Sequence, residues 1–307
     1  MELNIRKYTE WQDTAETLHL LLQMMGKVKL SRMEAQPEWN HVLLQITPRG
    51  FTTGLIPNGE DAFAIDLNLY ESEISVSTVS GRESAFPLIS GTPVSRYFGD
   101  FTNSLSDVMC GTEIYPGPQE MSVTTPFDED HEPRKYDRDA AIDFFRMNVF
   151  AYEEIYKFIA PFRGKRILPS FFWGTFDMTG VLFGGEEAPW PGAGIIEAVA
   201  FDENMMEFGF WPGDPNVAEP SFYILTYPFP TKDYTDAGIR PDKAVYSTAK
   251  SEFFFTLRDV LSYADPSAAL QEFWKSGYEI FSKGQGWNAC DWIEKPLIIE
   301  KGSPKLK

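Results

Sequence analysis

Three polar residues on the first predicted helix have side chains that can bind a ligand or move a proton. His19, Gln23 and Lys27 follow one another at intervals of four residues, so they line one flank of a helix. An imidazole on such a flank can contact a ligand or carry a proton. The commoner alternative is a histidine that hydrogen-bonds to a neighbouring backbone carbonyl. Both interpretations place this flank at the edge between core and solvent.

A second pair of candidates comes from the segment after this helix. His41 opens a strand-like run, and Arg49 lies in the Pro-Arg-Gly turn that follows. A guanidinium can hold a carboxylate or phosphate through two parallel hydrogen bonds. The chain carries 45 acidic residues, so Arg49 can equally form an ion pair with one of its own carboxylates.

The stretch FFWGTFDMTG, residues 171–180, is the most distinctive of the chain. Alternation along one unbroken strand would place Phe171 and Trp173 on one face and Phe172 on the other. Asp177 would then share the face of Phe171 and Trp173. A carboxylate beside a tryptophan is typical of a small-molecule pocket, although a buried Asp paired with an Arg would give the same pattern.

Trp211 ends a strand-like run before a Pro-Gly turn, where it can border a pocket or simply pack. Tyr223 and Tyr227 share one face of the next strand. The predicted ligand-binding residues are therefore His19, Gln23, Lys27, His41, Arg49, Trp173, Asp177 and Trp211.

No motif identifies a reaction or a catalytic residue. The chain has no phosphate-binding Gly-rich loop, no Gly-x-Ser-x-Gly elbow and no His-Glu-x-x-His helix. The acidic run FDEDHEP, residues 127–133, could hold a hard cation but lacks the calcium-loop pattern, so a solvated loop is favoured and no metal site is predicted. Cys110 and Cys290 are far apart and form no Cys-x-x-Cys pair.

Hydrophobic periodicity predicts the elements that must position these residues. Helices are expected at 11–25, 93–109, 138–162, 251–263 and 266–282, and strands at 41–47, 51–56, 62–70, 73–79, 167–178, 180–184, 194–201, 205–211 and 221–228. The tail carries Trp287 and Trp292. Residues 116–137 are rich in Pro and acids, which favours a linker or a long ordered loop.

The order of these elements suggests an internal duplication. Residues 62–81 align without gaps with residues 194–213, and each segment reads as two strands joined by an acidic turn. Chance agreement between hairpin-rich segments is the alternative. We therefore predict an α+β fold of helix, antiparallel sheet and helix units, in which the two sheets either merge into one extended sheet or stay separate. The units would span 1–118 and 138–307, with a linker or loop at 119–137.

Composition limits the classes of partner. The chain of 307 residues has 27 basic and 45 acidic side chains and a net charge of −18. Such a surface repels nucleic-acid phosphates and anionic membranes, so we expect neither as a partner. The first residues lack the apolar core and cleavage site of a signal peptide, which leads us to expect a cytoplasmic location.

The chain resembles a largely bacterial family catalogued as domain of unknown function 5996, over about 11–287. The resemblance rests on the TLH…Q…GK run of 17–27, on HV…T.RG.TT from 41 to 53, on FFWGTFD (171–177) and on GFWPG (209–213). It implies no activity. Histidines that the family pattern often has are replaced here by Ser170 and by Phe201 in the Val-Ala-Phe-Asp string. Any role of those histidines in metal binding or proton transfer would be lost.

Three functional hypotheses remain at this stage. The preferred one is a cytoplasmic small-molecule-binding protein with its pocket between the two units. The alternatives are an enzyme of unidentified class that uses the same pocket, and a non-catalytic interaction or scaffold protein. The sequence identifies no cofactor, no ligand and no oligomeric state.

Overall fold

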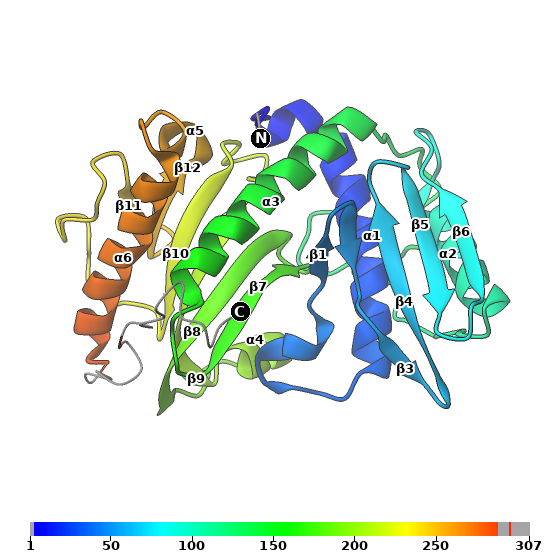
Figure 1. Cartoon of the computed structure of the whole chain (residues 1–307), viewed down its shortest axis with the longest axis horizontal. Coiled ribbons are helices and arrows are strands. Elements are labelled where there is room, and N and C mark those ends of the chain that lie inside the picture. The colour runs from blue at the N-terminus through cyan, green and yellow to red at the C-terminus, as the bar shows by residue number, and fades with distance from the viewer. Residues whose placement is uncertain (1–2, 288–294, 296–307) are drawn as a thin grey trace, which may run out of the picture.

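The first part of the chain forms a six-stranded antiparallel sheet with helices beside it (Figure 1). A computed structural model describes residues 3–287 and 295. The first elements are α1 (Tyr8–Arg32), the 3-10 helix η1 (Pro37–Val42), β1 (Gln45–Thr47), β2 (Gly50–Thr52), β3 (Ile56–Asn58), β4 (Asp61–Asn68), β5 (Glu73–Thr78), β6 (Glu83–Pro87) and α2 (Val94–Asp107). The strand order is β1-β2-β4-β5-β6, and β3 also pairs with β4.

The second part of the chain forms another six-stranded antiparallel sheet, with the order β11-β12-β10-β9-β8-β7. Its elements are α3 (Arg138–Ile159), β7 (Arg166–Phe172), β8 (Asp177–Glu187), α4 (Ile195–Ala200), β9 (Glu203–Trp211), β10 (Ser221–Tyr227), β11 (Val245–Ser247), β12 (Glu252–Thr256), α5 (Leu257–Val260) and α6 (Pro266–Gln285). Helices combined with antiparallel sheets confirm the predicted α+β class.

Several predicted elements are wrong in type. Residues 194–201 are not a strand but contain α4, because a short apolar run with Glu197 and Ala198 fits a helix as well as a strand. Residues 251–263 begin with β12, and the helix starts only after Thr256, whose side chain accepts a hydrogen bond from the Asp259 amide. Residues 41–47 begin inside η1 and reach a strand only at β1.

The internal duplication is not confirmed. The gap-free alignment of 62–81 with 194–213 sets strand β4 against helix α4. The two sheets do meet, through one antiparallel bridge between Leu44 and Phe171. The Leu44 amide donates to the Phe171 carbonyl at 3.1 Å, and the Phe171 amide donates to Leu44 at 2.8 Å. The sheets are thus joined at a single point beside β1 and β7.

Helix α1 runs through the middle of the molecule (Figure 1) and is longer than predicted at both ends. Its stretch from Thr17 to Lys29 is buried on every side. Gly26 does not end the helix but lies inside it, where a Cβ atom would overlap the indole of Trp173. A helix enclosed in this way must find partners for its polar side chains, because an unpaired buried polar group is costly.

The segment 108–137 contains no helix or strand but is packed as an ordered loop. Phe127 is fully buried, and Asp130 and Tyr136 are nearly so. Asp130 accepts a hydrogen bond from Arg134 at 2.5 Å. This acid of the run 127–133 therefore forms an ion pair inside the protein. The predicted Trp292 and Cys290 lie outside the described residues.

One face of the second sheet carries the core. Phe171, Met178, Phe210, Phe222 and Phe255 are register partners across five neighbouring strands, and each is at most 1% exposed. Helices α3 and α6 cover this face (Figure 1). Helix α3 also reaches the first sheet, because its Phe144 and Phe145 contact Phe51 of β2. It therefore binds both sheets into one core.

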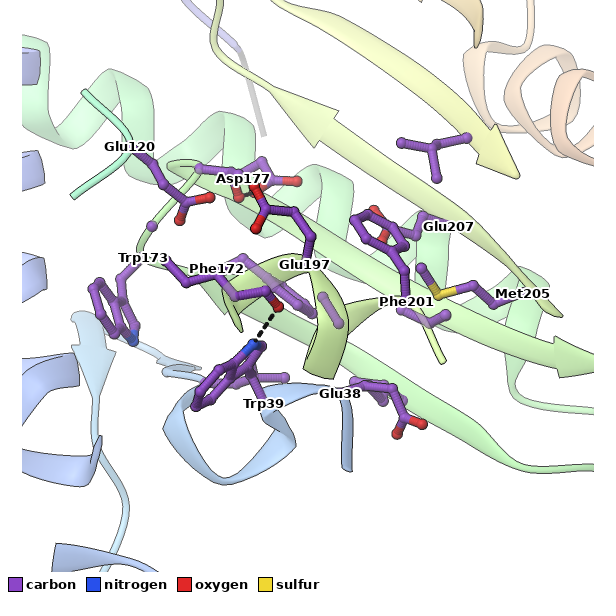
Figure 2. A pocket seen from close by; sticks show the side chains of 18 of the residues that line it. Glu38, Trp39, Glu120, Phe172, Trp173, Asp177, Glu197, Phe201, Met205 and Glu207 are labelled. Carbon is purple, nitrogen blue, oxygen red and sulfur yellow. Dashed lines mark hydrogen bonds between the residues drawn. The ribbon is translucent and has the colours of Figure 1, made fainter. Parts of the chain in front are cut away.

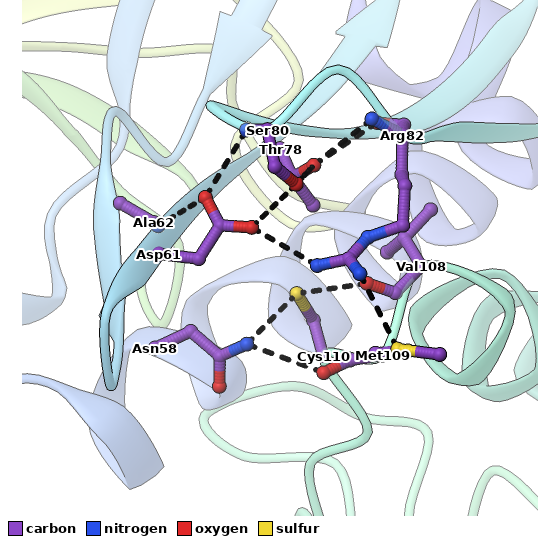
Figure 3. Close-up of polar contacts among 9 residues, drawn as sticks. All are labelled: Asn58, Asp61, Ala62, Thr78, Ser80, Arg82, Val108, Met109 and Cys110. Atoms are coloured by element: carbon purple, nitrogen blue, oxygen red, sulfur yellow. Dashed lines mark hydrogen bonds and ion pairs between the residues drawn. The ribbon is translucent and has the colours of Figure 1, made fainter.

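A cluster of polar contacts joins the turns beside β4 and β5 of the first sheet (Figure 3). Asp61 accepts from the Ser80 hydroxyl at 2.7 Å and from Arg82 at 3.0 Å. Asn58 donates to the Cys110 sulfur at 3.3 Å. Burial raises the pKa of the Cys110 thiol, which keeps it protonated. These bonds fasten the start of β4 to the turn between β5 and β6, and β3 to the segment that follows α2. Among the residues described, no helix is both long and apolar enough to cross a bilayer.

Gly180 tests how closely α3 packs on the second sheet. A Cβ atom there would lie 2.6 Å from Ile159 Cδ1 and 2.9 Å from Ile155 Cγ2. We expect Gly180→Ala to lower the free energy of unfolding by about 1–3 kcal/mol through overpacking. Gly99 of α2 has open space around it, so Gly99→Ala should raise stability by up to about 1 kcal/mol. Urea unfolding measures both, and equal effects of the two substitutions would contradict this packing.

Candidate functional site

A cavity lies on the face of the second sheet that α3 and α6 leave free (Figure 2). Its volume is about 440 Å³. The floor follows the strand register: Val181 pairs with Glu207, Glu207 pairs with Leu225, and Gly209 pairs with Tyr223. These residues alternate with the buried aromatic row, so the strands direct one set of side chains to the core and the other into the cavity.

The walls come from both parts of the chain. Trp39 and Glu38 of η1 face the short helix α4, and Glu120 of the long loop lies at one end. Gln119 also lines the cavity. The Trp39 indole donates to the Ile196 carbonyl of α4 at 2.9 Å. Glu38 and Trp39 have φ angles of 51° and 55°, a conformation that costs free energy in residues with a side chain. The ion pair of Glu38 with Lys165 at 2.5 Å helps to hold it.

The turn between β7 and β8 corrects the predicted face of Asp177. The strand is not unbroken: it ends at Phe172, and a turn with φ of 62° at Phe176 leads into β8. Asp177 pairs with Phe172 and therefore shares its face, not that of Phe171. Both Phe172 and Asp177 line the cavity, and Phe171 lies in the core. Trp173 lines the cavity from the turn itself.

Asp177 and Tyr223 form a hydrogen-bonded pair in the cavity floor. The Tyr223 hydroxyl donates to Asp177 and lies 3.0 Å from Thr179 Oγ1, and Thr175 also donates to Asp177. The Tyr223 ring crosses strand β9 over Gly209, where any Cβ atom would overlap it. Gly209 of the GFWPG run therefore lets a tyrosine of β10 reach an aspartate of β8.

Burial in these apolar surroundings makes the carboxyl groups weak acids. It raises the pKa of Asp177 to about 6, although the hydrogen bonds from Thr175 and Tyr223 act in the opposite direction. It also raises the pKa of Glu207 to about 8 and that of Glu252 to about 7, and in both the charge of Asp177 adds to the increase. At neutral pH, Glu207 is therefore mostly protonated and Asp177 mostly ionised.

The flank of His19, Gln23 and Lys27 does not line the cavity but lies directly behind its wall. His19 Nε2 lies 2.9 Å from the Trp173 carbonyl and 3.0 Å from the Gly174 carbonyl. Since both partners are acceptors, Nε2 carries the proton. Burial lowers the pKa of His19 to about 4, so the ring is neutral. It thus holds the β7–β8 turn in place by hydrogen bonds to backbone carbonyls.

Gln23 and Lys27 hold the loop that supplies the other end of the wall. The Gln23 side chain donates to the backbone carbonyl of Gln119 at 2.7 Å and accepts from the backbone amide of Gln119 at 2.8 Å. Lys27 Nζ donates to Gln119 Oε1 at 2.9 Å. The next residue, Glu120, packs against Gly174, where a Cβ atom would overlap its carboxylate. All three helix residues therefore position the wall of the cavity.

The other two early candidates lie elsewhere. His41 is buried and accepts from the Gln36 amide at 3.1 Å, which stabilises η1. Arg49 is exposed at the end of the first sheet and pairs with Glu71 at 2.7 Å, so it does not join the cavity. Of the eight predicted residues, Trp173, Asp177 and Trp211 line the cavity.

The two positions that depart from the family pattern lie close to the site. Phe201 lines the cavity, whereas Ser170 does not: it is buried in register with Thr179, whose hydroxyl contacts Tyr223 of the cavity floor. The Ser170 hydroxyl donates to the Leu168 carbonyl at 3.0 Å. Within residues 3–287, no three His, Cys, Asp or Glu side chains are grouped so that they could hold a metal ion.

Sequence reasoning missed Glu207, Glu252, Glu120 and Trp39. Glu207 carried a usable signal, because it is the one charged residue in the otherwise apolar run MMEFGFW of β9. A charge in a strand of this kind points to a polar contact inside a pocket. Glu120 and Trp39 lie in irregular segments, where periodicity says nothing about direction.

A comparison with protein-family models matches residues 4–292 to a family described as a family of unknown function, DUF5996. Searches of curated proteins and of solved structures found no match to this chain.

Gly209 provides a test of the floor of the site. Gly209→Ala should displace the Tyr223 ring and break its bond to Asp177, which we expect to lower the free energy of unfolding by about 2–4 kcal/mol. Tyr223→Phe keeps the ring and removes only the hydroxyl, so its loss should be smaller, about 1–2 kcal/mol. Urea unfolding at neutral pH measures both. A Gly209→Ala variant as stable as the wild type would contradict this geometry.

The raised pKa of Glu207 predicts a pH dependence of stability. Its ordinary value is 4.5 and its value in the folded chain is about 8, so the folded state holds a proton that the unfolded chain loses. The stability contributed by this group is complete below about pH 4.5 and is lost as the pH rises through about 8. In Glu207→Gln this loss is absent.

We therefore expect the free energy of unfolding of Glu207→Gln, relative to wild type, to increase from about pH 5 to about pH 9 by on the order of 4 kcal/mol. Urea titrations across this range measure the difference. Parallel stability profiles of the two proteins would show that Glu207 has an ordinary pKa.

Proposed function

The chain belongs to the family of unknown function DUF5996, and we propose that it is a cytoplasmic small-molecule-binding protein whose ligand occupies the cavity on the second sheet. The observation that carries this proposal is the make-up of the cavity. A volume of about 440 Å³ lies within the range of about 300 to 1,000 Å³ that is typical of ligand sites. Its lining is mostly aromatic and aliphatic, with a few polar groups in defined places.

The lining is divided along the strands in a way that suits an amphipathic ligand. Leu43, Val181, Phe183 and Met205 form an apolar cluster of their own, separate from the main core. The opposite ends of β8 and β9 carry Asp177 and Trp211, which lie in the polar part. A ligand with an apolar body and one polar end would match both parts.

Residues directly behind the cavity wall also support a binding role. His19, Gln23 and Lys27 are all used to fix segments of its wall. Such support keeps the cavity open in advance, and a site that is already formed loses less entropy when its ligand binds. A packed interior without a cavity would have favoured the scaffold hypothesis instead.

An enzyme that uses the same cavity is the second candidate. Asp177 and Glu207 have pKa values pushed to about 6 and about 8, which is the pattern of an acid and a base in one site. We rank binding first because Asp177 already accepts hydrogen bonds from Thr175 and Tyr223, which occupy its carboxylate.

A blocked cavity tests the proposal. Ala200 lines the cavity from α4, whereas Ala198 of the same helix is exposed and does not. We expect the uncharged dye Nile red to bind the wild type and Ala198→Trp, and to lose at least about tenfold in affinity for Ala200→Trp because the indole fills the space. Dye fluorescence measures this.

Native mass spectrometry of the freshly purified protein complements the dye. A retained small molecule that is present in wild type and Ala198→Trp, and absent in Ala200→Trp, is the expected result. Equal dye affinity in all three proteins, with no retained molecule, would overturn the proposed function.

A further inference from the structure

The cavity contains many more carboxyl groups than amino groups. Its lining includes the carboxyl groups of Glu38, Glu120, Asp177, Glu197, Glu207 and Glu252, and the ammonium group of Lys250. Of these six acids, only Glu38 has an ion-pair partner within 4.0 Å in the described part of the chain. The other five carboxyl groups share the cavity with one ammonium group, that of Lys250.

Glu207 is the acid with a raised pKa that lies nearest the middle of the cavity floor, between two apolar residues. It rises from the middle of β9 between Val181 and Leu225, which are both apolar. Within the described residues, no hydrogen bond or ion pair reaches its carboxyl group, and the side chain points into the cavity beside Phe201 (Figure 2). A polar group placed in this way is poorly hydrated and has no partner in the protein, which is costly unless a ligand supplies one.

The aromatic rings of the cavity already hold one ammonium group. Lys250 Nζ lies 5.2 Å from the ring centre of Trp211, a cation–π distance, and its charge acts on Glu252. The side chains of Trp39, Phe172 and Phe201 line the same cavity, and among residues 3–287 no cation is seen over their rings. Rings beside unpaired carboxylates are the arrangement that recognises organic ammonium ions.

From these observations we infer that the ligand is an organic cation, a primary amine with an apolar body, whose ammonium group is held by Glu207 and Glu252. This inference rests on the proposed binding function and names its ligand class. An ammonium has three donors, enough for more than one carboxylate. The apolar body would lie on Val181, Met205 and Phe201, in the apolar part of the cavity.

Binding of this kind must be linked to protons. Burial raises the pKa of Glu207 to about 8, so an arriving ammonium group replaces a proton on this residue. The groups that face Glu207 are Asp177 of β8, Tyr223 of β10, Glu252 and Lys250 at β12, Glu197 of α4 and Glu120 of the long loop. Because the pKa values of Asp177 and Glu252 are also raised, affinity should increase with pH between about 6 and 8.5.

Three ligands with the same indole body test the inference: tryptamine, tryptophol and indole-3-propionate, which end in an ammonium, a hydroxyl and a carboxylate. Isothermal titration calorimetry on the full chain at pH 8, with EDTA present, measures their affinities. We expect tryptamine to bind at least about tenfold more tightly than tryptophol, and indole-3-propionate to bind most weakly. Tryptamine binding should release protons, measured in buffers of different ionisation enthalpy.

Variants assign the effect to the named carboxylates. Glu207→Gln keeps the shape of the protonated acid, so it should fold, and it should lose the preference for tryptamine while its affinity for tryptophol stays within about twofold. Glu252→Gln is the second variant and should weaken tryptamine binding in the same direction. Glu187→Gln is the matched control, because Glu187 is exposed on β8 and does not line the cavity.

The outcomes separate the ligand class from the binding function. Equal affinities for tryptamine and tryptophol overturn the inference of a cationic ligand and leave the binding function in place. Binding of Nile red without binding of tryptamine also overturns the cationic ligand and leaves the binding function in place. If tryptamine, tryptophol and Nile red all fail to bind, both the ligand class and the binding function are overturned.

Discussion

The turn from Trp173 to Phe176 is the constraint on which the rest of the structure depends. Phe176 is stacked between His19 and Phe144, with ring centres 4.7 and 4.9 Å away. The Trp173 indole fits over Gly26 and donates to the Val42 carbonyl at 3.0 Å. Helices α1 and α3 and the segment before β1 therefore all meet at this turn. Since it also opens into the cavity, the contact that joins the two parts of the chain is the one that shapes the site.

The two faces of the second sheet differ: one is buried in the core, and the other borders the cavity. The face under α3 and α6 buries one aromatic row and supplies most of the stabilising burial of apolar area. The opposite face is covered only in part, by η1 and by α4, a helix with no fully buried residue. A sheet covered in this way leaves room for a ligand because its stability does not depend on filling that space.

Two effects act on the carboxyl groups of the cavity in opposite directions: burial among apolar side chains favours the protonated form, and hydrogen bonds from neighbouring hydroxyls favour the ionised form. Glu207 and Glu252 are half-buried among apolar side chains, which limit their contact with water and favour their protonated forms. Asp177 stays mostly ionised near neutral pH because Tyr223 and Thr175 donate to it. A positively charged ligand would relieve the remaining negative charge, in keeping with the strongly acidic chain around it.

Local pattern was sufficient for the α+β class, for long periodic elements such as α3, and for three cavity residues in two aromatic motifs. It failed where a run was short, as in α4, because a few apolar residues suit a helix and a strand alike. Only the tertiary structure decided that Asp177 shares a face with Phe172, since a turn reverses the chain between them, and that His19 supports the wall and does not line it. Whether a polar residue contacts a ligand or a backbone carbonyl depends on segments that are distant in sequence, as the bond from His19 to the Trp173 carbonyl shows. The spacing of residues along one helix carries no information about such distant segments.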